Sequence, residues 1–475
     1  MKKAAVIGVA VVVVLVGGSP ALTGGMARKQ YEAQIDKIAA ALPAIKVVER
    51  KYEQGLFSST ATTTFQVGCD AAAITVRDRI AHGPFPDFSG FGLARIDTRI
   101  ALPPDAPAPL RAWMEGLGPE ALRTTVGFGG ASETRLNLPA GQFKDAQGGE
   151  SGSLQWKPVS ATFRVDGAMT RMSYELDAPE VTLDFTARDE KGSFKLVNLR
   201  GQFDGEPMAG NWLTGVGAGA FTIDHMQMDV TGGQSQGVQF NLNQMKYTVK
   251  SQAEKDLLSA TASVTATADF KMGKTALKLD KIELQESVKR LHAPTLHALT
   301  LGFWQEMGNL CKAQPAGDDA IQTLRDKRAA MLAALAQLLP YDPEYSMDKI
   351  AVSVGGQEGT LAYSLAAHGM TAQDLQGGDP RQLVGKITAK ASGKIPVAWL
   401  EGIGAAMMSE RSGGASPQQV QELVHKQLGG IIDELAGQGY VTREGDALSS
   451  SAQFEQGKLT VNGKPLSVPL PLPGQ

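Results

Sequence analysis

The sequence predicts an α+β protein dominated by a large, curved antiparallel sheet, either an open trough or a sandwich, with flanking amphipathic helices and an N-terminal membrane anchor. Three observations predict it. Apolar and polar residues alternate from about 155 to 285 with no helical period between them. Two later segments have a helical period, and an unbroken apolar run stands at the N-terminus. With 475 residues, 43% of them hydrophobic, the chain can bury more than one core.

The first 27 residues predict export. Met1-Lys2-Lys3 precedes the apolar run Ala4–Val16, and the next charged residue is Arg28. A cleaved signal peptide would use Ser19-Pro20-Ala21, whereas an uncleaved anchor would span roughly residues 4–26, near the ~20 residues that a bilayer needs. We favour the anchor. It places the chain in the inner membrane by a single pass, with the bulk outside the cytoplasm.

The two cysteines of the chain, Cys69 and Cys311, would then lie in an oxidising compartment. Two alternatives stay open for them. They pair as a disulfide that closes a long loop, or they are two buried free thiols.

Residues 28–290 are expected to hold one helix and the antiparallel region. The helix is Arg28–Leu42, and a threonine-rich strand follows at Ser59–Val67. The later strands are expected around the alternating apolar residues of 181–185, 221–230, 238–242, 245–249, 264–272 and 277–279.

The remaining chain is expected to form three regions. A helical region at 291–345 would contain Thr295–Trp304 and Asp319–Leu339. Strands at Lys349–Val354, Thr360–Ala366 and Val384–Ala391 would fill 346–400. The last region, 401–475, would hold the helix Pro417–Leu435 with Ser416 as N-cap, then the strands Ser449–Phe454 and Lys458–Val461, and a proline-rich tail.

No catalytic, cofactor-binding or metal-ligating residue is assigned. Gly233–Gly237 matches the G-x-S-x-G pattern around Ser235, but a strand pattern follows the serine where a nucleophile elbow needs a helix. Gly215–Ala220 matches a dinucleotide fingerprint, and again a strand pattern follows. His225 lacks a neighbour at metal-ligand spacing. The net charge of −3, without a basic run, argues against nucleic acid as a partner.

Methionines gather on the apolar positions of the strand region, beside aromatic residues. Methionine adapts its shape and suits a surface that accepts a flexible apolar ligand, although ordinary core packing is the explanation that we favour. The candidate ligand face consists of Met226, Met228, Phe240, Met245 and Tyr247.

Two motif pairs are more distinctive. The first joins Tyr52–Ala61, containing Gly55, Phe57 and Ser59, to His82-Gly83-Pro84-Phe85-Pro86. The second joins Gly439-Tyr440 to Gly457–Pro465, containing Asn462-Gly463. With the lysine-flanked apolar N-terminus, they resemble the YdgA/YihF-type domain-of-unknown-function family of Gram-negative inner-membrane-anchored periplasmic proteins. The resemblance implies a periplasmic location and offers no reaction.

Physically, these motifs indicate fold positions. We expect Gly55 to allow a turn with Tyr52 and Phe57 packed on either side of it. We expect His82 to fix a rigid loop by a hydrogen bond, with Phe85-Pro86 docked onto the sheet.

The leading hypothesis is therefore a non-enzymatic periplasmic protein, tethered to the inner membrane, whose apolar sheet face binds lipid acyl chains or an envelope protein. One alternative is a self-associating scaffold of the envelope. Another is an envelope hydrolase that uses Ser235. The sequence leaves the oligomeric state open.

Overall fold

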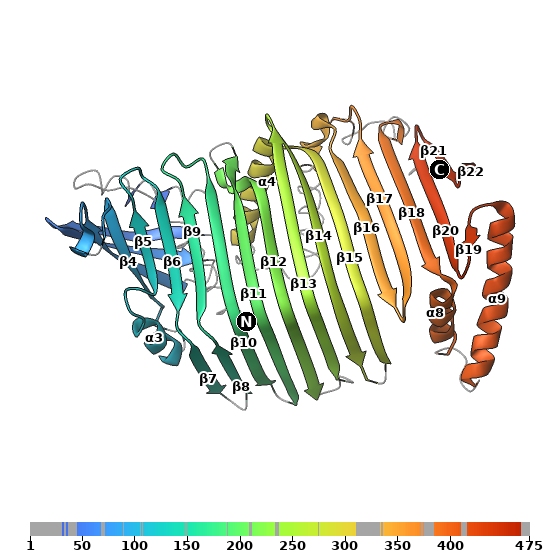
Figure 1. Ribbon diagram of the computed structural model, residues 1–475, viewed down its shortest axis with the longest axis horizontal. Coiled ribbons are helices and arrows are strands. Elements are labelled where there is room, and N and C mark those ends of the chain that lie inside the picture. The colour runs from blue at the N-terminus through green and yellow to red at the C-terminus, as the bar shows by residue number, and fades with distance from the viewer. Residues whose placement is uncertain are drawn as a thin grey trace. The chain divides into compact units, whose positions relative to one another are not determined.

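The computed structural model is built mainly of antiparallel strands (Figure 1). It describes residues 31–32, 35–36, 45–67, 72–88, 90–104, 106, 108–147, 150–187, 189–208, 211–232, 237–273, 275–309, 333, 336–371, 374, 384–409 and 416–466. The chain divides into two compact units. Unit 1 comprises residues 1–252, 270–276 and 293–330, and unit 2 comprises 253–269, 277–292 and 331–475.

Unit 1 contains an open antiparallel sheet in which neighbouring strands pair in the order β1-β2-β3-β4-β5-β6-β9-β10-β11-β12-β13. The hairpin β7–β8 joins the sheet through β8, which pairs with residues 181–186 of β10. The strands are β1 (Ile45–Gln54), β2 (Ser58–Val67), β3 (Ala72–His82), β4 (Ala94–Ala101), β5 (Leu122–Val126), β6 (Ser132–Leu138), β7 (Gly141–Gln147), β8 (Glu150–Trp156), β9 (Val159–Val165), β10 (Met172–Ala187), β11 (Glu190–Met208), β12 (Asn211–Gly232) and β13 (Val238–Glu254). A 3-10 turn, η1 (Pro86–Phe88), follows β3, and the helices are α3 (Ala108–Glu115) and α4 (Ala293–Asn309).

Unit 2 repeats the antiparallel plan with pairing order β15-β16-β17-β18-β20-β21-β22, and β19 lies on β20. The strands are β14 (Leu257–Met272) and β15 (Thr275–His292), which belong mostly to this unit, β16 (Glu344–Val354), β17 (Gln357–Ala367), β18 (Ile387–Pro396), β19 (Thr442–Glu444), β20 (Ala447–Glu455), β21 (Lys458–Val461) and β22 (Lys464–Leu466). A 3-10 turn, η2 (Leu339–Tyr341), precedes β16, and the helices are α8 (Val397–Ser409) and α9 (Pro417–Gln438).

The predicted β-dominated antiparallel fold is confirmed, and the sheets are open. Alternation correctly located the long strands of 172–254 and the pair β20–β21. It missed α3 and the short strands β4 to β9, because their apolar runs are only a few residues long, and it missed α8, whose glycines and alanines leave no helical period. The strand predicted at Val384–Ala391 is instead Ile387–Pro396. The predicted helix Asp319–Leu339 lies outside the described residues except at 333 and 336–339.

The first hairpins hold a compact core on one face. Ala61, Ile80, Ala94 and Val126 are each at most 2% exposed, and Tyr31, Tyr52, Leu93 and Ile96 pack around them. Polar side chains are buried beside this core. Asp78 of β3 accepts hydrogen bonds from Thr98 Oγ1 (2.6 Å) and from the Tyr31 hydroxyl (2.9 Å).

Helix α9 begins as predicted. The Ser416 hydroxyl accepts from the Gln419 amide, and the Gln419 side chain accepts from the Ser416 amide, which is a complete capping box. The helix ends at Gln438, three residues beyond the predicted Leu435, and its C-cap Gly439 has a φ of 77°, which suits glycine.

Candidate ligand-binding faces

An apolar row crosses six neighbouring strands of unit 1. Each member lies opposite the next in the strand register, in the order Phe143, Leu154, Leu183, Phe194, Met228 and Phe240. A second row runs parallel to it through Trp156, Val181, Leu196, Met226 and Leu242. Five steps of about 4.8 Å make the first row about 24 Å long. Side chains on neighbouring strands therefore build one extended apolar surface, which we call the apolar face.

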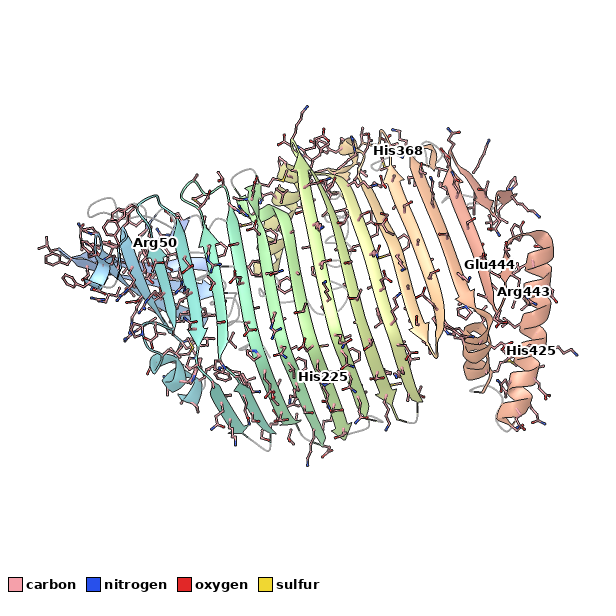
Figure 2. The ribbon with its side chains drawn as sticks, in the orientation of Figure 1. Arg50, His225, His368, His425, Arg443 and Glu444 are labelled. Atoms are coloured by element: carbon pink, nitrogen blue, oxygen red, sulfur yellow. The ribbon has the colours of Figure 1, made fainter. Side chains whose placement is uncertain are left out.

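The residues between these rows point to the opposite side of the sheet and are polar. One polar row is Gln155, Thr182, Lys195, Gln227 and Asn241, and the next is Ser153, Asp184, Ser193, Asp229 and Gln239. His225 belongs to this side: its Nδ1 lies 2.6 Å from Asn243 Oδ1, and Gln227 Nε2 donates to Asp229 Oδ2 at 2.6 Å. Figure 2 shows His225 in the lower half of the strands. Its neighbours are amides, and they satisfy the ring without a metal.

The apolar face is open. Leu183 is 37% exposed, Phe185 36% and Met228 39%, and the other members of its two rows are half-buried. A packed core would reduce these side chains below a tenth of their free surface, as the first hairpins do for Ile80. Core packing therefore does not account for Met228 or Leu183.

The predicted ligand residues fall into two groups. Met226, Met228 and Phe240 lie together on the apolar face. Met245 and Tyr247 pair with Ile223 and Phe221, beyond a line where regular alternation is interrupted. Asn198 and Gln244 lie on that line with φ of 52° each, and the Asn198 amide donates to Asp224 at 2.7 Å.

Beyond this line, an aromatic cluster continues across β10 to β13. The Tyr174 and Phe203 rings stack at 5.9 Å, and Phe221 lies 5.9 Å from Tyr174 and 6.3 Å from Tyr247. The glycines of β12 make room for these rings: a Cβ on Gly219 would lie 3.1 Å from the Phe203 ring. The glycine-rich stretch Gly215–Ala220 lies inside β12, where Gly217 allows a close backbone approach to Asp204 O and no turn forms.

Unit 2 holds a second apolar site, which the sequence did not indicate. A groove of about 570 Å³ lies between its sheet and the helices α8 and α9. Figure 1 shows both helices beside the end of β18 and β20. Its lining is aliphatic and aromatic, with Ile350, Val352, Leu361, Ile395, Trp399, Leu400, Leu428, Ile431, Ile432, Leu435, Val441 and Leu448.

Two features of this groove make it a candidate site. Ile431 is 55% exposed and Leu361 44% exposed, although both line it. The Trp399 indole nitrogen is buried and has no hydrogen-bond partner among the described residues. A buried indole N–H usually finds an acceptor. The sequence did not predict α8, because its glycine and alanine residues leave no regular apolar period.

The signature motifs meet in pairs. In unit 1, His82 Nε2 lies 3.0 Å from Ser59 Oγ and the His82 amide donates to Phe57 O at 2.9 Å, so the two halves of the first motif are joined. A Cβ on Gly55 would lie 2.5 Å from Ser58 O, and one on Gly83 2.1 Å from Gly92 O. The Gly83–Pro84 peptide is cis.

In unit 2, the second pair joins the end of α9 to the last hairpin. Asn462 Nδ2 donates to Gly439 O at 3.2 Å, and Ser450 Oγ donates to Tyr440 O at 2.7 Å. Asn462 and Gly463 form the β21–β22 turn, with φ of 48° and 77°.

Two expectations about the first motif were wrong: Phe57 is 81% exposed and Phe85 58% exposed, so neither packs onto the sheet.

Several predicted features lie outside the described residues: the N-terminal segment 1–27, Cys69, Cys311 and Ser235. The strands β12 and β13 that flank Ser235 pair with each other, so its pattern connects a hairpin. In the described part of the chain, no helix is long and apolar enough to cross a membrane, and no three His, Cys, Asp or Glu side chains are grouped to hold a metal ion.

The fold and its faces define a β-dominated protein with open antiparallel sheets. The chain belongs to the family DUF945, bacterial proteins of unknown function, whose profile matches residues 1–469. Comparisons with curated proteins and with solved structures found no match.

Proposed function

We propose that this protein binds the acyl chains of lipids on its open apolar surfaces, as a non-enzymatic protein of the bacterial envelope tethered to the inner membrane. The observation that carries the proposal is the apolar face of unit 1, where a polar row alternates with an apolar row across six strands. Alternation of this kind gives a sheet two different surfaces, and the apolar one is exposed.

The dimensions fit an acyl chain. The first row is about 24 Å long, whereas one leaflet of a bilayer's hydrocarbon core is about 15 Å thick. An extended acyl chain could therefore lie along the row over its whole length. A peptide bound in extended form would need a strand edge or polar groups for its backbone, and the apolar face offers neither.

The groove of unit 2 supports the same chemistry. Its volume of about 570 Å³ lies in the usual range for small-ligand sites. The unpartnered Trp399 N–H would donate to an ester carbonyl, and Lys394 at the groove margin is paired with Glu444 at 3.0 Å. The groove therefore favours an uncharged apolar chain with one acceptor.

Native mass spectrometry of the full chain, released from mild detergent, tests the proposal after organic extraction of bound molecules. We expect a stoichiometric phospholipid or acylated species. Phe240→Glu should reduce the lipid-bound fraction, whereas Asn241→Glu, the neighbour on the polar side of β13, should leave it unchanged. In α9, Ile431→Glu and Gln427→Glu form the same kind of pair for the groove. A clean unliganded mass, or equal loss in both members of each pair, contradicts acyl binding.

A further inference from the structure

One end of the unit 1 sheet carries exposed apolar side chains at its loop tips. Phe88 is 98% exposed, Leu56 85%, Phe57 81%, Phe91 72%, Phe85 58% and Phe128 48%. We call these six residues the aromatic rim. They come from the β1–β2 turn (55–57), the β3–β4 loop (83–93) and the β5–β6 turn (127–131).

Antiparallel pairing places these three connections at the same end of the sheet. β3 pairs with both β2 and β4, and β4 pairs with β5, so every second connection returns to that end. The long β4–β5 connection, which contains α3, lies at the other end; Figure 1 shows α3 at the lower edge and the β5–β6 turn at the upper edge. The rings are also in contact: Phe91 lies 5.3 Å from Phe85 and 4.6 Å from Phe128.

The rim is held rigidly despite its exposure. Gly83 N donates to Leu93 O at 2.6 Å, Gly92 N to Pro84 O at 3.1 Å and Leu93 N to Val126 O at 2.8 Å. These bonds tie the β3–β4 loop to itself and to β5. A loop fixed in this way presents its aromatic rings without an ordering cost on binding.

Charge is absent from the tips. Asp87 is the one charged residue within 55–57, 83–93 and 127–131. Its carboxylate is paired with Arg79 and, at 2.7 Å, with Arg95, and the Arg79 guanidinium lowers the Asp87 pKa. A protein-binding patch usually has a polar border around its apolar centre. Exposed aromatic and leucine side chains at loop tips are typical of residues at a membrane interface.

The start of the described chain lies near the same end. The Tyr31 ring is 5.9 Å from the ring of Tyr52, which precedes the β1–β2 turn by three residues. Residue 27, the end of the predicted anchor, is four residues before Tyr31, a reach of at most about 14 Å. From Tyr52 the strand β1 continues for two residues, about 7 Å, to Gln54, where the turn that carries Leu56 and Phe57 begins. An anchor leaving the bilayer there would bring the rim to the lipid surface.

We propose that the aromatic rim inserts into the interface of the phospholipid bilayer that anchors the chain. The inference rests on the tethering part of the proposed function and does not depend on acyl binding by the apolar face. It assigns the first signature motif, Gly55 to Phe57 with His82 to Phe85, the task of building a membrane contact.

The test uses the full chain in nanodiscs of phosphatidylethanolamine and phosphatidylglycerol, prepared with ordinary and with brominated acyl chains. Phe88→Trp and, separately, Phe57→Trp add a fluorophore to two different loops. Val48→Trp is the matched control, because Val48 is 55% exposed in the same unit but lies in β1, away from the tip. None of the three replaces a buried side chain.

We expect the added emission of both rim tryptophans to shift to shorter wavelength and to be quenched in brominated nanodiscs, because an indole at the interface lies within reach of the acyl chains. The added emission of Val48→Trp should keep the wavelength and intensity of a solvated indole. If the rim tryptophans emit like the control while the chain is in the nanodisc, the membrane contact is refuted and acyl binding is unaffected. If the chain does not enter nanodiscs, the tether fails and the inference fails with it.

Discussion

Removing the hydroxyl of Tyr31 should loosen the attachment of Tyr31 and its neighbouring residues to the sheet. In Tyr31→Phe, Asp78 Oδ2 loses a 2.9 Å hydrogen bond, and Thr63 Oγ1 loses its 2.8 Å partner. The shape of the ring is unchanged. A hydrogen bond to a charged group contributes about 1.5–3 kcal/mol, so the free energy of local unfolding should fall by about that amount at a pH where the Asp78 carboxyl is ionised.

The effect should depend on pH because burial raises the pKa of Asp78 above its ordinary value of 3.8. A carboxyl with a raised folded-state pKa binds its proton more tightly when folded. Its contribution to stability is therefore greatest below pH 3.8 and decreases as pH rises through the folded-state pKa. Tyr31→Phe removes a bond that favours the carboxylate, so the decrease should extend to higher pH. Below pH 3.8 the bond joins neutral groups, and the cost should shrink to about 0.5–1.5 kcal/mol.

Hydrogen exchange of the full chain measures this locally, which avoids assuming that two units unfold together. Amides of β2 and β3 should exchange about 10- to 100-fold faster in Tyr31→Phe at a pH where the Asp78 carboxyl is ionised, since about 1.4 kcal/mol is a factor of ten. Thr64→Val on β2 is the control, because its hydroxyl contact with Thr75 (3.2 Å) is only partly buried. Equal exchange in the wild type and Tyr31→Phe would refute the role of this network.

Three further outcomes follow from local geometry. Gly217→Ala puts a Cβ 2.2 Å from a backbone oxygen, so hydrogen exchange should show that β11 and β12 lose about 1–3 kcal/mol of local stability. Gly429→Ala lies in open space on α9 and should stabilise that helix by about 0.5–1 kcal/mol. Equal effects of the two substitutions would contradict the close approach at Gly217. Ser416→Ala should destabilise the first turn of α9 by about 1 kcal/mol, and unchanged exchange there would exclude the capping box. Lys349→Ala should raise the Glu283 pKa from about 2 toward 4.5 in a carboxyl NMR titration. The ion pair stabilises the fold above pH 4.5, and this stabilisation is lost as the pH falls through about 2. An unchanged Glu283 pKa would contradict the pairing.

The sequence predicted those parts of the fold that depend on residues within a single strand or helix. Alternation over Val181–Phe185 and Val238–Leu242 places apolar side chains on one side of a strand whatever lies beside it. Ser416 and Pro417 mark the start of α9 for a similar reason, since a cap acts within four residues. Met226, Met228 and Phe240 could therefore be predicted as neighbours on one face.

Tertiary structure decided what covers each apolar surface, because alternation states a side chain's direction and not its environment. It buried Asp78 and Thr98 under Tyr31, left Met228 and Leu183 open, and joined Ile350 to Leu448 in one groove across about a hundred residues of chain. It also turned Phe57 and Phe85 outward, where the sequence favours packing. Contacts between distant segments depend on which strands pair and where each connection returns, and the spacing of residues along one strand does not contain that information.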